Sequence, residues 1–234
     1  METVTIDGMA AAYGRPEGPG PFSGIIVLHE AFGLNDDIRR ITERFASEGY
    51  AAAAPNLYSP GLAPICIART VLDMARGGGN TIGRIDAVRR WLADRPEVDG
   101  RRIGVIGFCM GGGFALTAAV RHDFAVASVN YGRVPREAAD LEGVCPVVAS
   151  YGKEDRPLLS HASRLTDMLE QLGAPHDVKV YPGAGHSFMN RGAPGWVKRF
   201  MKLGYKEDAA EDSWRRILNF FSERLRTSSA SGSE

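Results

Sequence analysis

The chain has 234 residues, a length that suits one large α/β domain and is short for two average ones. Its 44% hydrophobic and 24% charged residues are ordinary globular values, so the composition argues against disorder. The 28 basic and 28 acidic residues give a formal net charge of zero, which offers no long-range attraction to nucleic acid or to an anionic membrane.

The N-terminal residues METVTIDGMAAAYG lack the charged-then-apolar pattern of a signal peptide, and no window approaches an apolar membrane span. The odd number of cysteines, Cys66, Cys109 and Cys145, favours reduced thiols. They form no CxxC or Cys/His cluster, so a zinc site is not expected. We therefore expect a cytoplasmic protein that uses no metal and contacts neither membrane nor nucleic acid.

Short apolar runs alternate with longer amphipathic segments, which predicts an α/β fold with a mostly parallel central sheet and helices on both faces. The first strand alternates and is typical of an edge, whereas the later ones are nearly continuous apolar runs. Strands are expected at residues 2–13, 24–29, 50–54, 102–107, 125–131, 146–151 and 176–181.

Helices are expected between these strands. The helix at 35–48 begins with Asn35 and two acidic residues and ends at Gly49, and the helix at 159–172 ends at Gly173. The longest helix should bury one apolar face containing Trp214, Ile217, Leu218 and Phe221. The predicted helices cover residues 35–48, 82–94, 159–172 and 206–226, with one more after residue 109.

Residues 1–226 should form a single domain, followed by a disordered tail at 227–234. Two segments, 58–80 and 187–205, fit the alternation poorly. In a sheet of this type such insertions decorate the rim of the site at the carboxyl ends of the strands. A plain surface excursion is the alternative.

The stretch GVIGFCMGGGF, residues 104–114, has the G-x-S-x-G frame of a nucleophile turn, with Cys109 in place of serine. A strand runs into it and a helix follows, which is the context that this sharp turn requires. The helix start would also favour a thiolate at Cys109. The alternative is a buried structural cysteine, since cysteine is often buried.

An acid and a histidine should follow the nucleophile in that order. The loop GKEDRP after the strand at 146–151 offers Asp155, which we prefer to Glu154, and the loop PGAGHSF after the strand at 176–181 offers His186. His186 would exchange protons with Cys109, and Asp155 would fix its tautomer. Three other histidines, His122, His161 and His176, are expected to be structural or to face the solvent.

The segment HEAFG, residues 29–33, follows an early strand, where this type of fold places the second oxyanion donor. The backbone N–H groups of Met110 and Ala31 are therefore the expected oxyanion hole. Glu30 in the same loop would repel a developing negative charge. It either points away to pair with an arginine or contacts the thiol and helps to set its protonation.

Six motifs spread in order from about residue 20 to 225 together resemble the dienelactone hydrolase family: HEAFG, PNLY at 55–58, GFCMGG, YGKED, GAGHSF and SWRRILNFF. The resemblance implies an α/β-hydrolase fold and a Cys109–His186–Asp155 catalytic triad without a cofactor. It also implies that Glu30 contacts the resting thiol until the substrate binds. The implied activity is hydrolysis of an ester or lactone through an acyl-cysteine intermediate, as in carboxymethylenebutenolidases.

The substrate is less well defined. Family members that cleave dienelactone have an arginine on the fourth residue after the histidine, whereas here that residue is Asn190 and Arg191 follows it. Arg69, Arg76 and Arg84 are alternative sources for a second arginine. The candidate substrate-binding residues are Phe32, Arg69 and Arg191.

We therefore predict a cysteine-dependent esterase or lactonase with a small-molecule substrate, acting as a monomer or small homo-oligomer. Two alternatives belong to other classes. One is a non-catalytic relative whose thiol senses oxidants or electrophiles, and the other is a binding protein on a retained fold. A sensor has no use for Asp155 and His186 in this order.

Overall fold

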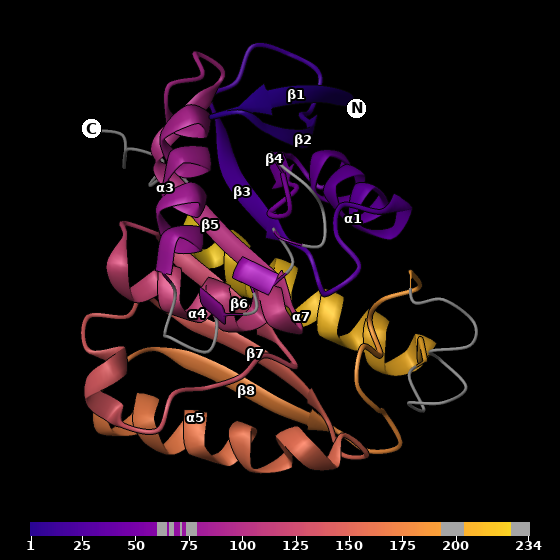
Figure 1. Ribbon diagram of the computed structural model, residues 1–234, viewed down its shortest axis with the longest axis vertical. Helices are drawn as coiled ribbons and strands as arrows, with labels where there is room; N and C mark the ends of the chain where they lie inside the picture. The colour runs from indigo at the N-terminus through magenta and orange to yellow at the C-terminus, as the bar shows by residue number, and fades with distance from the viewer. Residues whose placement is uncertain (60–64, 66–67, 71, 74–78, 193–203, 226–234) are drawn as a thin grey trace, which may run out of the picture.

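The computed structural model describes residues 1–59, 65, 68–70, 72–73, 79–192 and 204–225 (Figure 1). Their strands form one eight-stranded sheet in the order β1-β2-β4-β3-β5-β6-β7-β8. All neighbours from β4 to β8 are parallel, and β1 and β2 are antiparallel additions at one edge. The strands are β1 Glu2–Ile6, β2 Met9–Gly14, β3 Phe22–Leu28, β4 Tyr50–Pro55, β5 Val98–Phe108, β6 Val126–Asn130, β7 Val147–Gly152 and β8 His176–Tyr181.

The expected single strand at residues 2–13 is wrong. The segment folds back on itself as β1 and β2, with Glu2 opposite Tyr13 and Ile6 opposite Met9. Asp7 and Gly8 both have positive φ, 48° and 74°, which is the geometry of a two-residue hairpin turn. The Asp-Gly pair was the sequence signal for this turn.

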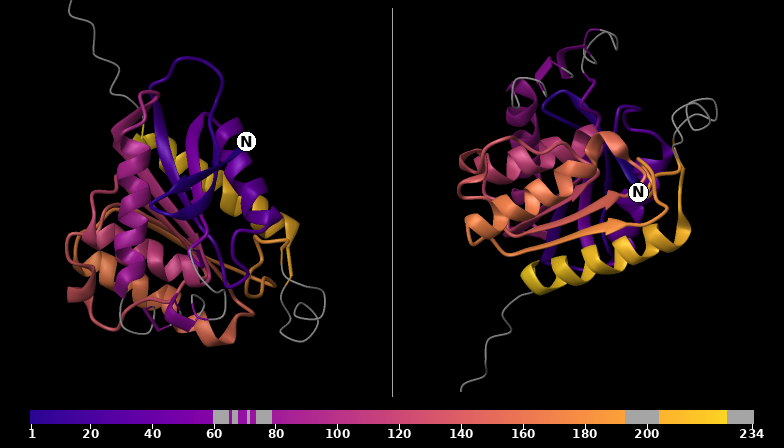
Figure 2. Two further views of the ribbon diagram at one scale, coloured as in Figure 1. Left: turned by 45° about the horizontal axis from the view of Figure 1, so that its top comes forward. Right: turned by 90° about the horizontal axis from the view of Figure 1, so that it is seen from below.

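Helices cover both faces of the sheet, as predicted (Figure 2). On one face α1 Asp36–Ser47 packs against β2, β3 and β4, and α7 Glu207–Leu225 packs against β5, β6 and β7. On the other face lie α3 Gly79–Ala93, α4 Met110–Arg121 and α5 Leu159–Gln171. Two short 3-10 turns, η1 Ala138–Leu141 and η2 Arg156–Leu158, lie in the connections.

The predicted start of α1 is confirmed. The Asn35 side chain accepts a hydrogen bond of 3.0 Å from the Ile38 N–H, which satisfies one of the unpaired amides of the first turn. Gly49 and Gly173 follow α1 and α5 with φ values of 94° and 62°, a conformation that glycine adopts without steric cost.

The apolar face predicted for the last helix is also confirmed. Trp214, Ile217 and Phe221 are at most 1% exposed, and Leu218 is partly buried. The Trp214 ring meets the Phe45 ring of α1 edge-on, at 5.6 Å between centroids. Burial of these side chains supplies most of the energy that holds α7 to the sheet.

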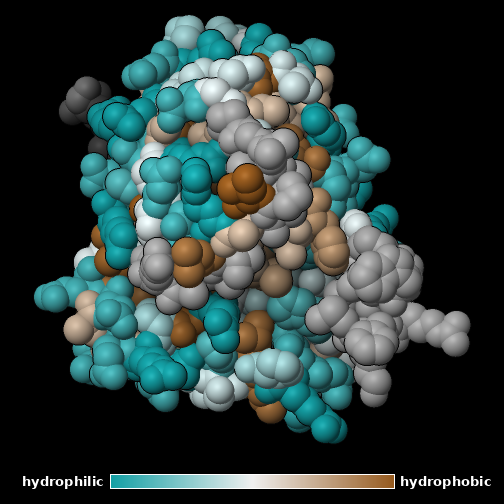
Figure 3. All heavy atoms as spheres, in the orientation of Figure 1, coloured by the Kyte–Doolittle hydropathy of each residue, from teal (hydrophilic) through white to brown (hydrophobic). Residues whose placement is uncertain are grey.

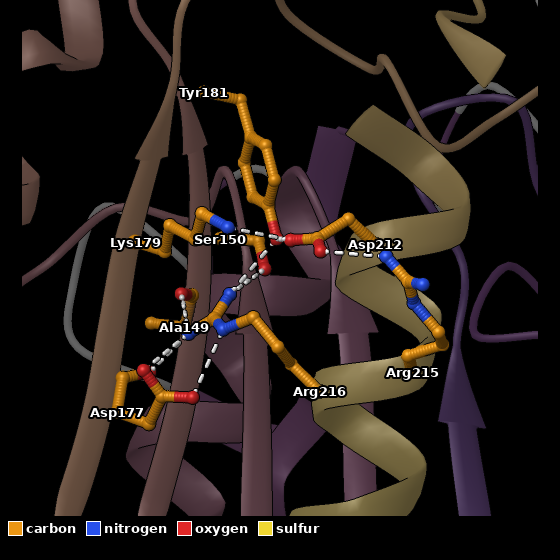
Figure 4. Close-up of polar contacts among 8 residues, drawn as sticks. All are labelled: Ala149, Ser150, Asp177, Lys179, Tyr181, Asp212, Arg215 and Arg216. Carbon is orange, nitrogen blue, oxygen red and sulfur yellow. Dashed lines mark hydrogen bonds and ion pairs between the residues drawn. The ribbon is translucent and has the colours of Figure 1, made fainter. Parts of the chain in front are cut away.

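Polar contacts between α7 and β8 orient the helix on the sheet (Figure 4). Arg216 donates to the Asp177 carboxylate and to the backbone oxygen of the same residue, each at 2.9 Å. Asp212 accepts from Lys179 at 2.7 Å and from the Tyr181 hydroxyl at 2.8 Å. These bonds fix α7 along β8, the strand that leads into the loop of His186.

Parts of the prediction fall on residues outside the described ones. The tail at 227–234 is one, and the two insertions are described only at residues 58–59, 65, 68–70, 72–73, 79–80, 187–192 and 204–205. The face in Figure 3 is mainly hydrophilic with separate hydrophobic spots. Within the described part of the chain, none of the helices has the length and apolar character needed to cross a lipid bilayer.

Candidate active site

Cys109 occupies the sharp turn between β5 and α4. Its backbone has φ 54° and ψ −114°, a conformation that is strained for a residue with a side chain. Its amide donates to the Asn130 carbonyl at 3.0 Å. A Cβ on Gly107 would collide with the backbone of Gly111, and a Cβ on Gly111 would collide with the backbone of Leu28. The glycine frame is therefore what lets α4 approach β3 and β5 so closely.

The first amide of α4 belongs to Met110. An α-helix leaves its first N–H groups without an intrahelical acceptor, so this donor is available beside the Cys109 sulfur. The carbonyl of Cys109 accepts from the amides of Gly112 and Gly113 at 3.0 and 3.3 Å, which closes the first turn. The positive end of the helix dipole favours negative charge at this position.

Asp155 and His186 come together from the loops after β7 and β8. The His186 Nδ1 lies 2.6 Å from the Asp155 Oδ2, and the Asp155 side chain is only 5% exposed. The Glu154 amide donates to the Ala184 carbonyl at 2.9 Å, which joins the two loops. The Glu154 side chain is exposed, so the geometry favours Asp155 as the partner, as expected.

His186 also contacts the thiol. Burial alone would lower the pKa of His186, but hydrogen bonds to Asp155 and Cys109, together with the charges of both, raise that pKa to about 10. Since Nδ1 is engaged by Asp155, Nε2 is the atom left for the sulfur. The raised pKa favours the protonated form of the His186 imidazole.

Glu30 is buried in the same site at 2% exposure. Its Oε2 accepts a hydrogen bond of 3.0 Å from the Ser187 hydroxyl. Burial, then the charges of Cys109 and Glu30, raise the pKa of Tyr58 to about 12. Glu30 and Cys109 thus both act on Tyr58. Whether Glu30 contacts the thiol stays a prediction.

The loop of Ala31 is held by two residues that the sequence reasoning did not single out. His29 is fully buried, its Nδ1 donates to the Glu30 carbonyl at 2.7 Å, and its Nε2 accepts from the Leu57 amide at 3.0 Å. Burial lowers the pKa of His29 to about 4, so it remains neutral. The Tyr58 hydroxyl donates to the Ala31 carbonyl at 3.1 Å. The motifs HEAFG and PNLY contained both residues.

Two of the three candidate substrate-binding residues, Phe32 and Arg69, are exposed. Phe32 is 37% exposed, and Arg69 is exposed on the partly described segment 58–80. The Arg191 guanidinium packs over the Tyr205 ring at 4.1 Å from its centroid, whereas Asn190 is buried. Their role in substrate binding stays a prediction.

The other three histidines make local contacts. Nδ1 of His161 accepts from the Val134 amide at 2.9 Å, His176 bonds the Ala174 carbonyl at 2.9 Å, and His122 lies 3.5 Å from Asp86. No group of three or more potential metal-ligating side chains occurs within the described ranges.

Comparisons with known proteins identify relatives of this chain and of its fold. The family model of the dienelactone hydrolase family matches residues 9–225. A Salmonella typhimurium protein named "Putative carboxymethylenebutenolidase" is 31% identical over 235 residues, covering 93% of this chain and 83% of that protein.

Two crystal structures extend the likeness. A dienelactone hydrolase-like promiscuous phosphotriesterase from metagenomic libraries has a TM-score of 0.81 and 25% identity, covering 96% of this chain and 98% of that one. A dienelactone hydrolase from Anabaena variabilis shares the fold, with a TM-score of 0.73 and 19% identity over 96% of this chain and 97% of that one. The chain therefore belongs to the dienelactone hydrolase family, with the α/β fold of these hydrolases.

Proposed function

We propose that the protein hydrolyses lactones or activated carboxylic esters with Cys109 as the nucleophile, through an acyl-cysteine intermediate. The observation that carries the proposal is the linked series of contacts from the Cys109 thiol to His186 and on to Asp155. Such a series is the arrangement by which a histidine activates a nucleophile while an acid orients it.

In the acylation step the Cys109 thiolate, paired with the protonated His186, attacks the carbonyl carbon, and the carbonyl electron pair moves to the oxygen. The amides of Met110 and Ala31 would stabilise this oxyanion. The oxyanion then collapses and the bond to the leaving oxygen breaks. His186, which is protonated near neutral pH, gives its proton to that oxygen. An ester releases its alcohol, whereas a lactone opens and keeps its new hydroxyl on the acyl chain.

Acylation prepares His186 for the second step. The charge of Cys109 is one of the causes that raise the pKa of His186, and a thioester carries no such charge. The pKa of His186 therefore falls once the sulfur is acylated. The neutral imidazole takes a proton from water, and the hydroxide adds to the thioester carbonyl carbon. The C–S bond then breaks, which releases the carboxylic acid and leaves the Cys109 thiolate beside the reprotonated His186.

A sensor function is less well supported. Sensing by disulfide formation requires a second reactive thiol near the first. Cys145 is partly buried, and desolvation raises its pKa to about 12, so it is a poor partner near neutral pH. Cys66 lies outside the described residues.

Mixing the protein with p-nitrophenyl acetate is expected to release p-nitrophenol in two phases. Because p-nitrophenolate is a good leaving group, acylation should be faster than deacylation, and a burst of about one equivalent per protein molecule should come before steady turnover. Stopped-flow absorbance measures both phases, and a carboxylate-bearing lactone run in parallel measures preference between substrate types. Release no faster than that of the Cys109→Ala variant at every substrate concentration would refute the proposal.

Glu30→Gln is expected to speed alkylation of Cys109 by iodoacetamide at neutral pH by several-fold. The carboxylate charge opposes a nearby thiolate, and glutamine removes the charge at nearly the same size. Labelling rates across the pH range, read by peptide mass, should differ between this variant and the wild type. Glu154→Gln, an exposed carboxylate on the neighbouring loop, is the matched control. Coincident profiles for Glu30→Gln and wild type would remove Glu30 from the mechanism.

A further inference from the structure

A buried chain of hydrogen bonds runs beneath the imidazole of His186. The Tyr131 hydroxyl donates to the Asn190 Oδ1, and the Asn190 Nδ2 donates to the Asp37 Oδ2 at 2.9 Å. The Asp37 Oδ2 also accepts the Arg191 amide at 2.9 Å, and its Oδ1 pairs with Arg40 at 2.7 Å. The chain connects the end of β6, the segment after His186 and the first turn of α1.

The side-chain polar atoms of Tyr131 and Asn190 all take part in hydrogen bonds. Tyr131 and Asn190 are 0% and 2% exposed, and Asp37 is 6% exposed. Burial, then the charges of Glu30, Cys109 and Asp37, raise the pKa of Tyr131 well above its usual value, so its hydroxyl stays protonated and can donate. Because these groups are buried, a donor or acceptor that loses its hydrogen bond has no water to replace it. The loss of one bond therefore destabilises the whole network.

The chain touches the candidate catalytic histidine directly. The Tyr131 ring meets the His186 ring edge-on at 5.2 Å between centroids and meets the Phe188 ring at 5.6 Å. Tyr131 therefore supports the imidazole from below while Asp155 holds its Nδ1. Asn190 lies four residues after His186 and anchors the far end of the same loop.

Strained backbone conformations occur at residues of the site and of this hydrogen-bond network. Besides Asp7 in the hairpin, the non-glycine residues described with positive φ are Cys109, Tyr131 and Ser187, at 54°, 41° and 59°. Such conformations persist only where the surroundings over-determine them. Ser187 is fixed on one side by its bond to Glu30, and the segment after it is fixed by the Asn190 contacts.

We propose that Asn190, together with Tyr131 and Asp37, is a positioning residue that holds His186 in register with Cys109 and Asp155. The inference rests on the proposed function for the role of His186. In this role the Asn190 side-chain amide is occupied by its hydrogen bonds to Tyr131 and Asp37, so it is not available to bind a substrate. The effect should fall on kcat, because a misplacement of about 1 Å costs up to 10²-fold in rate while substrate contacts stay.

The test compares Tyr131→Phe and Asn190→Leu with Tyr13→Phe. Tyr13 is a matched control, a buried tyrosine whose hydroxyl bonds Glu97 in a separate cluster on β2. The two network variants should lower kcat for p-nitrophenyl acetate by about tenfold to a hundredfold with KM changed less than about threefold. The control should keep both constants.

A second readout does not depend on turnover. The His186 Nδ1 proton, held in the bond to Asp155, should give a low-field proton NMR resonance, assigned by its loss in His186→Gln. It should shift or broaden in both network variants and stay unchanged in Tyr13→Phe, with far-UV circular dichroism showing that each variant is folded. Asn190→Asp sets two carboxylates together and should lose activity, and adding Asp37→Asn should restore part of it.

The two readouts separate this inference from the proposed function. Wild-type kcat and an unmoved resonance in folded Tyr131→Phe and Asn190→Leu would overturn the positioning role, even if Cys109 is the nucleophile. A perturbed resonance in both would support the positioning role, even if p-nitrophenyl acetate is not turned over by the wild type.

Discussion

Asp155→Asn is expected to lower kcat/KM for p-nitrophenyl acetate by about 10²- to 10⁴-fold, since an amide removes the charge that stabilises the imidazolium and favours the wrong tautomer. The pH dependence should change as well. Burial opposes the charged imidazole, and the hydrogen bond to Asp155 is the largest contribution among those that raise the pKa of His186 to about 10. His186 donates protons below that pKa and cannot above it. The fall in kcat/KM at alkaline pH, near pH 10 in the wild type, should therefore move to lower pH in Asp155→Asn.

Profiles of kcat/KM from pH 5 to pH 11 measure this shift, with subtraction of the uncatalysed hydrolysis. Glu154→Gln changes a carboxylate one residue away whose side chain is exposed, so it should keep the wild-type profile. If the two variants lose activity equally, the bond between Asp155 and His186 has no special part in turnover.

The sequence predicted the elements that position the site. Continuous apolar runs correctly indicated the parallel strands β3 to β7. The loops that follow β7 and β8 bring Asp155 beside His186, at 2.6 Å. The glycine frame around Cys109 was readable because only a strained, tightly packed turn requires glycine at both Gly107 and Gly111.

Other features depend on contacts that no local pattern encodes. Asn190 is 59 residues from Tyr131 and 153 residues from Asp37 in the sequence, although it forms a hydrogen bond with each. No spacing or periodicity in the sequence relates the three residues. His29 lay within a motif, but its neutral state follows from complete burial. The β1–β2 hairpin differs from the single strand that alternation predicts, because the Asp-Gly turn reverses the chain within the alternating segment.

Cys109→Ala is expected to abolish turnover of p-nitrophenyl acetate, a loss of about 10⁴-fold or more in kcat. Removing the sulfur leaves the oxyanion donors and His186 without a group to attack the carbonyl, so only slow catalysis by water remains. The fold should survive, since the thiol contributes little burial at a partly exposed position. Thermal melting of both proteins verifies this point.

Cys145→Ala is the matched control, because it removes a partly buried thiol that desolvation keeps protonated. This variant should retain wild-type kcat and KM. A Cys109→Ala protein that is folded and still turns over the ester at the wild-type rate would exclude the nucleophile assignment.

The acyl-cysteine intermediate is the central claim, and rapid acid quenching tests it most directly. The wild type is mixed with excess p-nitrophenyl acetate, stopped in acid within the burst, digested, and read by tandem mass spectrometry. We predict an added acetyl group on the peptide that contains Cys109, localised to its sulfur, at a level matching the burst and absent from Cys109→Ala. An acetyl group found only at another residue, or a p-nitrophenol burst with an unmodified Cys109, would contradict the account.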